Sequence, residues 1–216
     1  MRDYIFEKVE NTTRYFHFGG INVLEIDKFP DGMDLQNILH SLEKIFPARF
    51  FKGLKEMRIE HLPEFDDRNI NAMYRDGIFY ITNKQDNTKD LVEDIVHEFA
   101  HHLEMLYPTQ IYSDEMMIKE FIQKRAQLEF ELKSEGYWTE NYDFRNLKFD
   151  DKFDSFLYKK VGGQMLNMVT AGLFIRPYSS VSLREYFATG FEAYYTGKKD
   201  LLKQLSPVLY NKIELL

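Results

Sequence analysis

The 216-residue sequence predicts an α+β fold in a single domain. We expect a small mixed sheet in an N-terminal lobe, about residues 1–106, and a helical C-terminal lobe, about residues 107–216. Short runs of β-branched and aromatic residues are concentrated in the first third of the chain. Long stretches with apolar residues every three or four positions follow. At this length, one core or one core split into two lobes is favoured over several independent domains.

Several segments of the first third are predicted strands because β-branched and aromatic residues dominate them. In chain order they are Tyr4–Val9, Thr13–Phe18, Ile21–Ile26, Lys55–Leu62, Asn71–Tyr74 and Ile78–Thr82. Gly19-Gly20 predicts a tight turn between the second and third segments, and Asp76-Gly77 predicts a hairpin between the last two. A helix is expected at Asp34–Ile45, where apolar residues have helical spacing and Asp34 or Asp31 can act as the N-cap.

Two long helices are predicted next. One runs from Lys89 to Leu106 with Asn87 or Thr88 as its N-cap, and the other runs from Ser113 to Ser134 and stops at Gly136. The segment Glu135–Tyr158 has no clear period and is expected to be a loop or a short-helix insertion. Further helices are predicted at Gly163–Phe174, Ser182–Tyr195 and Asp200–Leu205.

Composition excludes several functional classes. The chain carries 28 basic and 35 acidic side chains, a net charge of −7, so we expect no binding to nucleic acid. The absence of cysteine excludes a disulfide scaffold, a thiolate metal site and a cysteine nucleophile, so any metal must be held by histidine and carboxylate. We recognise no secretory signal and no membrane span, and expect a soluble protein without membrane partners, cytoplasmic by default.

The most informative segment for function reads IVHEFAHHLE from Ile95 to Glu104. Its His97 and His101 are four residues apart and therefore share one face of the predicted helix, so both imidazoles can bind one Zn²⁺ ion. Glu98 can then reach a water molecule on that ion. Phe99 and Ala100 face elsewhere and are expected to pack in the core. The pattern predicts a zinc site.

Two histidines do not complete a catalytic zinc site, which usually has three protein ligands and a water. The neighbouring His102 and Glu104 point to other faces of the helix and are poor candidates. The predicted helix at 182–195 offers Glu185 and Glu192, which are seven residues apart and share a face. From this spacing, either carboxylate can complete the site.

The histidine helix and a segment near residue 180 resemble the gluzincin peptidases of the anthrax lethal factor type, which include the Pro-Pro endopeptidases. In that family, the third zinc ligand is a glutamate that opens a Glu-aromatic-Phe-Ala-x-x-Phe segment and follows a catalytic tyrosine by seven residues. This sequence reads YSSVSLREYFATGF from Tyr178 to Phe191. The resemblance implies a zincin-like fold, with Glu185 as the third ligand and Tyr178 as the catalytic phenol.

Two features depart from the family pattern. Thr189 stands where the lethal factor pattern has a second glutamate, so a carboxylate beside the ligand is missing, which can weaken metal affinity or ligand orientation. The interval between His101 and Glu185 is longer than is usual for the family, consistent with an insertion at Glu135–Tyr158. The resemblance does not cover Met1–Lys55.

The residues and the resemblance together predict a zinc-dependent endopeptidase. Zn²⁺ on His97, His101 and Glu185 would activate water and polarise the scissile carbonyl. Glu98 would act as the general base, and Tyr178 would stabilise the oxyanion. The alternatives are a non-catalytic binding or structural protein that retains a zincin scaffold, and a metallohydrolase that acts on another kind of bond.

The expected partner is a polypeptide substrate. Immediately before the active helix, Ile78, Phe79, Tyr80 and Ile81 are predicted to form an edge strand that pairs with the substrate main chain. The alternative is an ordinary hairpin strand paired on both sides. The sequence indicates no cleavage motif and no oligomeric state.

Overall fold

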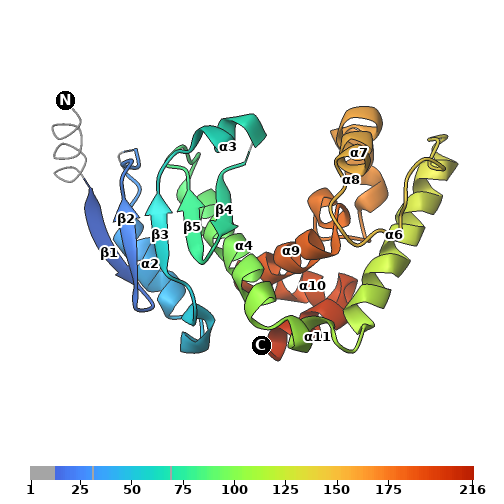
Figure 1. Ribbon diagram of the computed structural model, residues 1–216. Helices are drawn as coiled ribbons and strands as arrows, with labels where there is room; N and C mark the ends of the chain where they lie inside the picture. The colour runs from blue at the N-terminus through green and yellow to red at the C-terminus, as the bar shows by residue number, and fades with distance from the viewer. Residues whose placement is uncertain (1–12, 31, 69) are drawn as a thin grey trace. The chain divides into compact units, whose positions relative to one another are not determined.

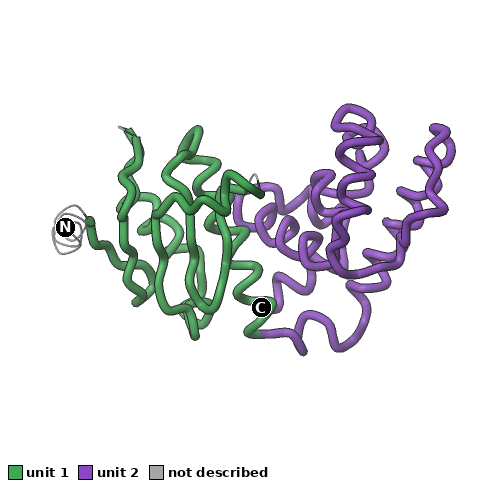
Figure 2. Tube along the Cα trace, turned by 45° about the horizontal axis from the view of Figure 1, so that its top comes forward, with its two compact units in different colours: residues 1–106 green, residues 107–216 purple. Residues whose placement is uncertain are grey.

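The computed structural model describes residues 13–30, 32–68 and 70–216, and the chain divides into two units, residues 1–106 and residues 107–216 (Figure 2). The fold is α+β, as predicted, because the described strands all lie in unit 1 and unit 2 is built from helices (Figure 1). The predicted strand Tyr4–Val9 and the candidate cap Asp31 lie outside the described residues. No helix in the described ranges has the length and apolar character needed to cross a membrane.

Unit 1 is built on a mixed sheet of five strands in the order β1-β2-β3-β5-β4. The strands are β1 Arg14–Phe18, β2 Ile21–Glu25, β3 Glu56–Ile59, β4 Ala72–Arg75 and β5 Ile78–Ile81. β2, β3 and β5 run parallel to one another, whereas β1 and β4 are antiparallel to their neighbours. Each strand predicted within the described residues is therefore present, with small differences at its ends.

β5 is an interior strand, not the edge strand predicted at this position. It pairs with β3 on one side and with β4 on the other. Because both sides of β5 are engaged, the prediction that Ile78, Phe79, Tyr80 and Ile81 form an edge strand open to the substrate main chain is wrong. Phe79 and Ile81 are fully buried in the core instead. The edge strand on this side of the sheet is β4.

The hairpin between β1 and β2 turns at Gly19 and Gly20, as predicted. Their φ angles are 56° and 90°, and short hairpin turns of this kind need residues that tolerate positive φ. The two glycines differ in their surroundings. A Cβ atom on Gly19 would lie 2.2 Å from the ring of Phe51, whereas nothing lies within 4 Å of a Cβ atom on Gly20.

Gly19→Ala is therefore expected to lower the free energy of unfolding more than Gly20→Ala does. Both substitutions place alanine at a positive φ, which costs about 1 kcal/mol. Only the first must also displace the Phe51 ring, and overpacking of this kind costs about 1–3 kcal/mol more. Urea denaturation of the two variants measures the difference, and equal losses would contradict the tight contact at Gly19.

The two main helices of unit 1 are α2, Leu35–Glu43, and α4, Thr88–Leu106. Each begins at a cap that the sequence predicts. The Asp34 carboxylate accepts a hydrogen bond from the N–H of Asn37 at 3.1 Å. The Asn87 amide oxygen accepts from the first N–H groups of α4 at 2.9 and 3.0 Å. The structure also contains a short 3-10 helix, η1 Ala48–Phe51, and α3 Pro63–Arg68, which the sequence does not predict.

An aromatic cluster holds α4 against the sheet. Phe99 of α4 lies at its centre, with ring centroids 4.7–5.6 Å from those of four other phenylalanines. These are Phe18 of β1, Phe46, Phe51 and Phe79 of β5. Figure 1 shows α2 and α4 on the same face of the sheet. The burial of Phe99 therefore fixes which side of α4 faces the core.

Unit 2 consists of helices joined by short connections and one longer loop. Its elements are α5 Pro108–Tyr112, α6 Met116–Ser134, α7 Asp151–Ser155, the π-helix η2 Phe156–Val161, α8 Gly163–Thr170, the 3-10 helix η3 Pro177–Ser180, α9 Leu183–Tyr195, α10 Lys199–Leu205 and α11 Pro207–Glu214. The helices predicted at Ser113–Ser134, Gly163–Phe174, Ser182–Tyr195 and Asp200–Leu205 are present with shifted ends. α5, η3 and α11 are additional. The segment Glu135–Tyr158, predicted as a loop or a short-helix insertion, contains a loop, α7 and the start of η2.

Charged side chains of α6 bind main-chain groups at the ends of other helices. The Glu120 carboxylate accepts from the N–H groups of Val208 and Leu209 at 3.0 Å, at the start of α11. Lys124 Nζ donates to the carbonyl of Leu205 at 2.5 Å, at the end of α10. Both contacts satisfy groups that a helix end leaves unpaired. α6 therefore packs in unit 2 through polar as well as apolar side chains.

Candidate metal centre

The α4 helix brings His97, Glu98 and His101 together. One side-chain ligand atom from each residue lies within 4.8 Å of the others. The two imidazole rings are 4.8 Å apart between centroids and nearly perpendicular, at 85°. Glu98 and His101 are buried, and His97 is half-buried. Imidazole and carboxylate donors at this separation can hold a metal ion, as the sequence pattern predicts.

The orientation of this group follows from the core packing of α4. Phe99 is two residues from both His97 and His101, so it projects from the opposite side of the helix, roughly 200° away. Phe99 and Ala100 are fully buried, which confirms the prediction that they are packing residues. Because Phe99 is fixed in the aromatic cluster, the two histidines must point away from that cluster.

His102 has a structural role, as its direction on the helix predicts. Its Nε2 lies 3.1 Å from the carbonyl oxygen of Lys52, and its Nδ1 lies 3.1 Å from the hydroxyl of Tyr74. Burial lowers the pKa of His102 and so favours the neutral ring. Since a carbonyl can only accept, Nε2 carries the proton and Nδ1 accepts from Tyr74. Both nitrogens of His102 are therefore used within unit 1.

Glu104 faces His101, a contact that the sequence reasoning missed. Its carboxylate oxygen lies 3.9 Å from His101 Nδ1. Carboxylates beside metal-binding histidines recur in proteins, where they orient the ring whose other nitrogen binds the metal. The three-residue spacing between His101 and Glu104 predicts this contact, because residues three apart on a helix are neighbours on its surface.

In unit 2, Tyr178 and Glu185 flank the start of α9. Tyr178 lies in η3, and Glu185 lies in the first turn of α9, where its N–H donates to the side chain of Ser182 at 3.2 Å. Both side chains are half-buried. Burial raises the pKa of Tyr178, and the negative charge of Glu185 raises it further. The phenol therefore keeps its proton at neutral pH and can act as a hydrogen-bond donor.

The other candidate carboxylate on α9 is engaged in an ion pair. Glu192 is buried and pairs with Arg176 through two contacts, at 2.7 and 3.1 Å. A bidentate pair of this kind is typical of a structural role. The hydroxyl of Thr189 donates to the main-chain carbonyl of Glu185. Of the two glutamates that spacing left open, the ion pair of Glu192 favours Glu185 as the ligand.

His97, Glu98 and His101 belong to unit 1, whereas Tyr178 and Glu185 belong to unit 2. The structure thus brings together the three residues of the His-Glu-x-x-His pattern in one unit and the tyrosine–glutamate pair in the other. Comparisons with protein-family models, with curated proteins and with solved structures find no match for this chain. A functional assignment therefore rests on the residues themselves.

Proposed function

We propose that the protein is a zinc-dependent endopeptidase with a zincin-like fold. The observation that carries the proposal is the cluster of His97, Glu98 and His101 on one face of α4. A purely structural metal site does not need the buried carboxylate of Glu98 beside the two imidazoles, whereas hydrolysis needs a general base at this position. The donor set also suits zinc, which binds imidazole and carboxylate in catalytic sites with one position left for water.

Glu185 is the proposed third ligand. Support comes from the resemblance of the segment Tyr178–Phe191 to the gluzincin pattern and from the ion pair that engages Glu192. The N-terminal turn of a helix also favours a negative charge, and Glu185 lies in the first turn of α9.

The proposed reaction is the hydrolysis of a peptide bond. Zn²⁺ at this site would supply Lewis acidity to a water molecule and to the scissile carbonyl oxygen. Glu98 takes a proton from the attacking water and delivers it to the leaving nitrogen. Tyr178 donates a hydrogen bond to the developing oxyanion.

We place the polypeptide substrate along β4, because this strand, not β5, forms the sheet edge on the side of α4. Tyr74 of β4 contacts His102 of α4 through its hydroxyl, so β4 and the metal-binding helix are tied together. An extended chain that adds to this edge would be held by main-chain hydrogen bonds, which give affinity without demanding particular side chains.

Tyr178→Phe tests the proposed chemistry. The variant is expected to bind zinc like the wild type but to cleave peptides about 10²–10³-fold more slowly in kcat, since one oxyanion donor is lost. Zinc content and cleavage of a peptide library measure the two properties. The matched control is Tyr210→Phe, which removes an exposed hydroxyl bonded to Glu214 in the same unit and should leave kcat unchanged. An unchanged kcat in Tyr178→Phe would contradict its catalytic role.

A further inference from the structure

Arg125 of α6 is a buried cation that donates to main-chain carbonyls. Only 1% of its surface is exposed. Its guanidinium carbon lies 4.0 Å from the ring centroid of Phe153, with Phe121 and Phe144 at 5.5 and 5.6 Å. Buried charges are normally paired with an opposite charge. The negative charges of Asp143 and Asp150 act on Arg125, but its side-chain hydrogen bonds among the described residues go to main-chain carbonyls.

The hydrogen bonds of Arg125 go to the main chain of two separate segments. Nη1 donates to the carbonyl of Ser180 at 3.0 Å, with a weaker contact to Val181 at 3.5 Å. Nη2 donates to the carbonyl of Asp143 at 3.0 Å. The first segment is the end of η3, and the second is the loop that follows α6. One planar guanidinium therefore ties the loop to η3, a geometry that lysine cannot reproduce.

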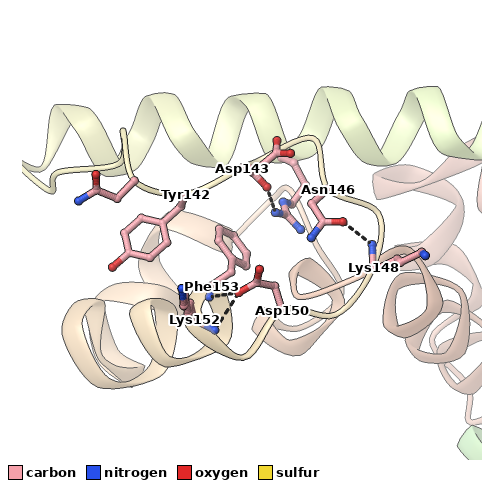
Figure 3. A pocket seen from close by; sticks show the side chains of 9 residues that line it. Tyr142, Asp143, Asn146, Lys148, Asp150, Lys152 and Phe153 are labelled. Atoms are coloured by element: carbon pink, nitrogen blue, oxygen red, sulfur yellow. Dashed lines mark hydrogen bonds between the residues drawn. The ribbon is translucent and has the colours of Figure 1, made fainter.

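The loop is itself held in shape by short-range hydrogen bonds. Figure 3 shows the Asn146 side chain accepting from the N–H of Lys148, and Asp150 accepting from the N–H groups of Lys152 and Phe153 at the start of α7. These residues line a small hollow of about 50 Å³ beside Arg125. Further along, the carbonyl of Leu147 accepts from the N–H of Leu183 at 2.9 Å. The loop thus supports the start of α9 at a second point.

Arg125 holds the carbonyls of Ser180 and Val181, and the loop holds the N–H of Leu183. All three groups lie in the segment that carries Tyr178 and Glu185. The carbonyls of Ser180 and Val181 fall between these two residues in sequence, and both are buried. The next residue, Ser182, caps α9 by accepting from the N–H of Glu185. Fixing the carbonyls of 180 and 181 therefore fixes the turn from which both functional side chains project.

We propose that Arg125 is a positioning residue: it holds residues 178–185 in the conformation that presents Tyr178 to the oxyanion and Glu185 to the metal. The proposal rests on the zinc-peptidase function proposed above. The segment 135–158, whose role the sequence leaves open, would then help to hold residues 178–185 through the carbonyls of Asp143 and Leu147. Burial lowers the pKa of Arg125 to about 10, so the side chain stays charged at neutral pH.

The experiment compares Arg125→Met with Lys124→Met. Lys124 is the adjacent residue of α6 and also donates to main-chain carbonyls, those of Leu173 and Leu205, but neither lies in the 178–185 segment. Each variant thus loses a cation that binds main-chain oxygen. Zinc affinity is measured by competition with a chelator, kcat and KM by peptide cleavage, and the folded state by circular dichroism at the temperature of both assays.

Arg125→Met is expected to bind zinc at least about tenfold more weakly and to lose about 10- to 100-fold in kcat with KM unchanged, since support around metal ligands is worth this much. Lys124→Met should keep the zinc affinity and kcat of the wild type, even if its melting temperature falls as much as that of Arg125→Met. Arg125→Lys, which keeps the charge but reaches one segment only, should lie between Arg125→Met and the wild type, and it serves as the test if Arg125→Met does not fold.

Two results would overturn the positioning role. One is an equal change in zinc affinity and kcat in the Arg125 and Lys124 variants, which would indicate a general loss of stability. The other is wild-type zinc affinity and kcat in folded Arg125→Met or, if that variant does not fold, in Arg125→Lys. Failure of the proposed function is distinguishable, because then the wild-type protein itself would neither bind zinc nor cleave peptides.

Discussion

Glu98→Gln is expected to remain folded, to retain its zinc and to lose about 10²- to 10⁴-fold in kcat. The amide has the size and shape of the carboxylate but cannot accept the proton of the attacking water, and general-base catalysis contributes a factor of this order. Because His97 and His101 are untouched, the metal content should stay near that of the wild type. Zinc content by elemental analysis and cleavage rates on a peptide library measure the two effects separately.

A matched control lies on α6. Glu129 pairs with Lys133 at 2.7 Å, so Glu129→Gln makes the same chemical change outside the His-Glu-x-x-His helix and should cleave like the wild type. Equal cleavage by Glu98→Gln and the wild type would reject the catalytic role of Glu98. Stoichiometric zinc with no cleavage by the wild type would favour the alternative, a binding or structural protein that retains the scaffold.

Glu185→Ala is expected to lose zinc, whereas Glu192→Ala keeps it. Removing a direct ligand should weaken zinc binding by more than the roughly 10- to 100-fold that the loss of an outer support costs, and kcat should fall with it. Glu192→Ala instead leaves Arg176 without the bidentate pair, so the free energy of unfolding should drop by about 1–3 kcal/mol. Chelator competition and urea denaturation distinguish a metal effect from a stability effect.

The opposite result would contradict the assignment of Glu185 as the third ligand. If Glu192→Ala releases zinc while Glu185→Ala retains it, the ligand is Glu192, two turns further along α9. The resemblance to the gluzincin segment would then fail at its central residue, and the role of Tyr178, which is assigned by its spacing from Glu185, would fail too.

Local signals explain why so many elements were predictable. Asp34 and Asn87 cap their helices with side-chain oxygens, and such caps depend only on residues within the first turn. Gly19-Gly20 and Asp76-Gly77 form turns that need positive φ, which few other residue pairs tolerate. α5 and α11 were missed although each begins with proline, a residue favoured at the first helical position.

Strand order was not predictable in the same way. β4 and β5 form the expected hairpin, yet β5 also pairs in parallel with β3, which places it inside the sheet and moves the edge to β4. Nothing within Ile78–Ile81 specifies a second neighbour, because parallel pairing is decided by the packing of the connection between β3 and β5. The position of a strand in a sheet is a property of the whole unit.

The same contrast applies to the site. His97, Glu98 and His101 could be found from the sequence because helical spacing alone brings them to one face. Arg125 could not, because its partners are the main-chain carbonyls of Asp143 and Ser180, which belong to every residue alike and lie far along the chain. Side-chain motifs are visible in a sequence, whereas main-chain recognition emerges only from the fold.

The most direct test of the central claim is X-ray absorption at the zinc edge on the wild-type protein loaded with one equivalent of zinc, with the zinc affinity of Glu185→Ala measured beside it by chelator competition. We predict imidazole nitrogens at about 2.0–2.1 Å and oxygens at about 2.0–2.2 Å in the wild type, and a zinc affinity in Glu185→Ala that is more than about 100-fold weaker. A protein that binds no zinc, a zinc environment without imidazole, or wild-type zinc affinity in Glu185→Ala would contradict it.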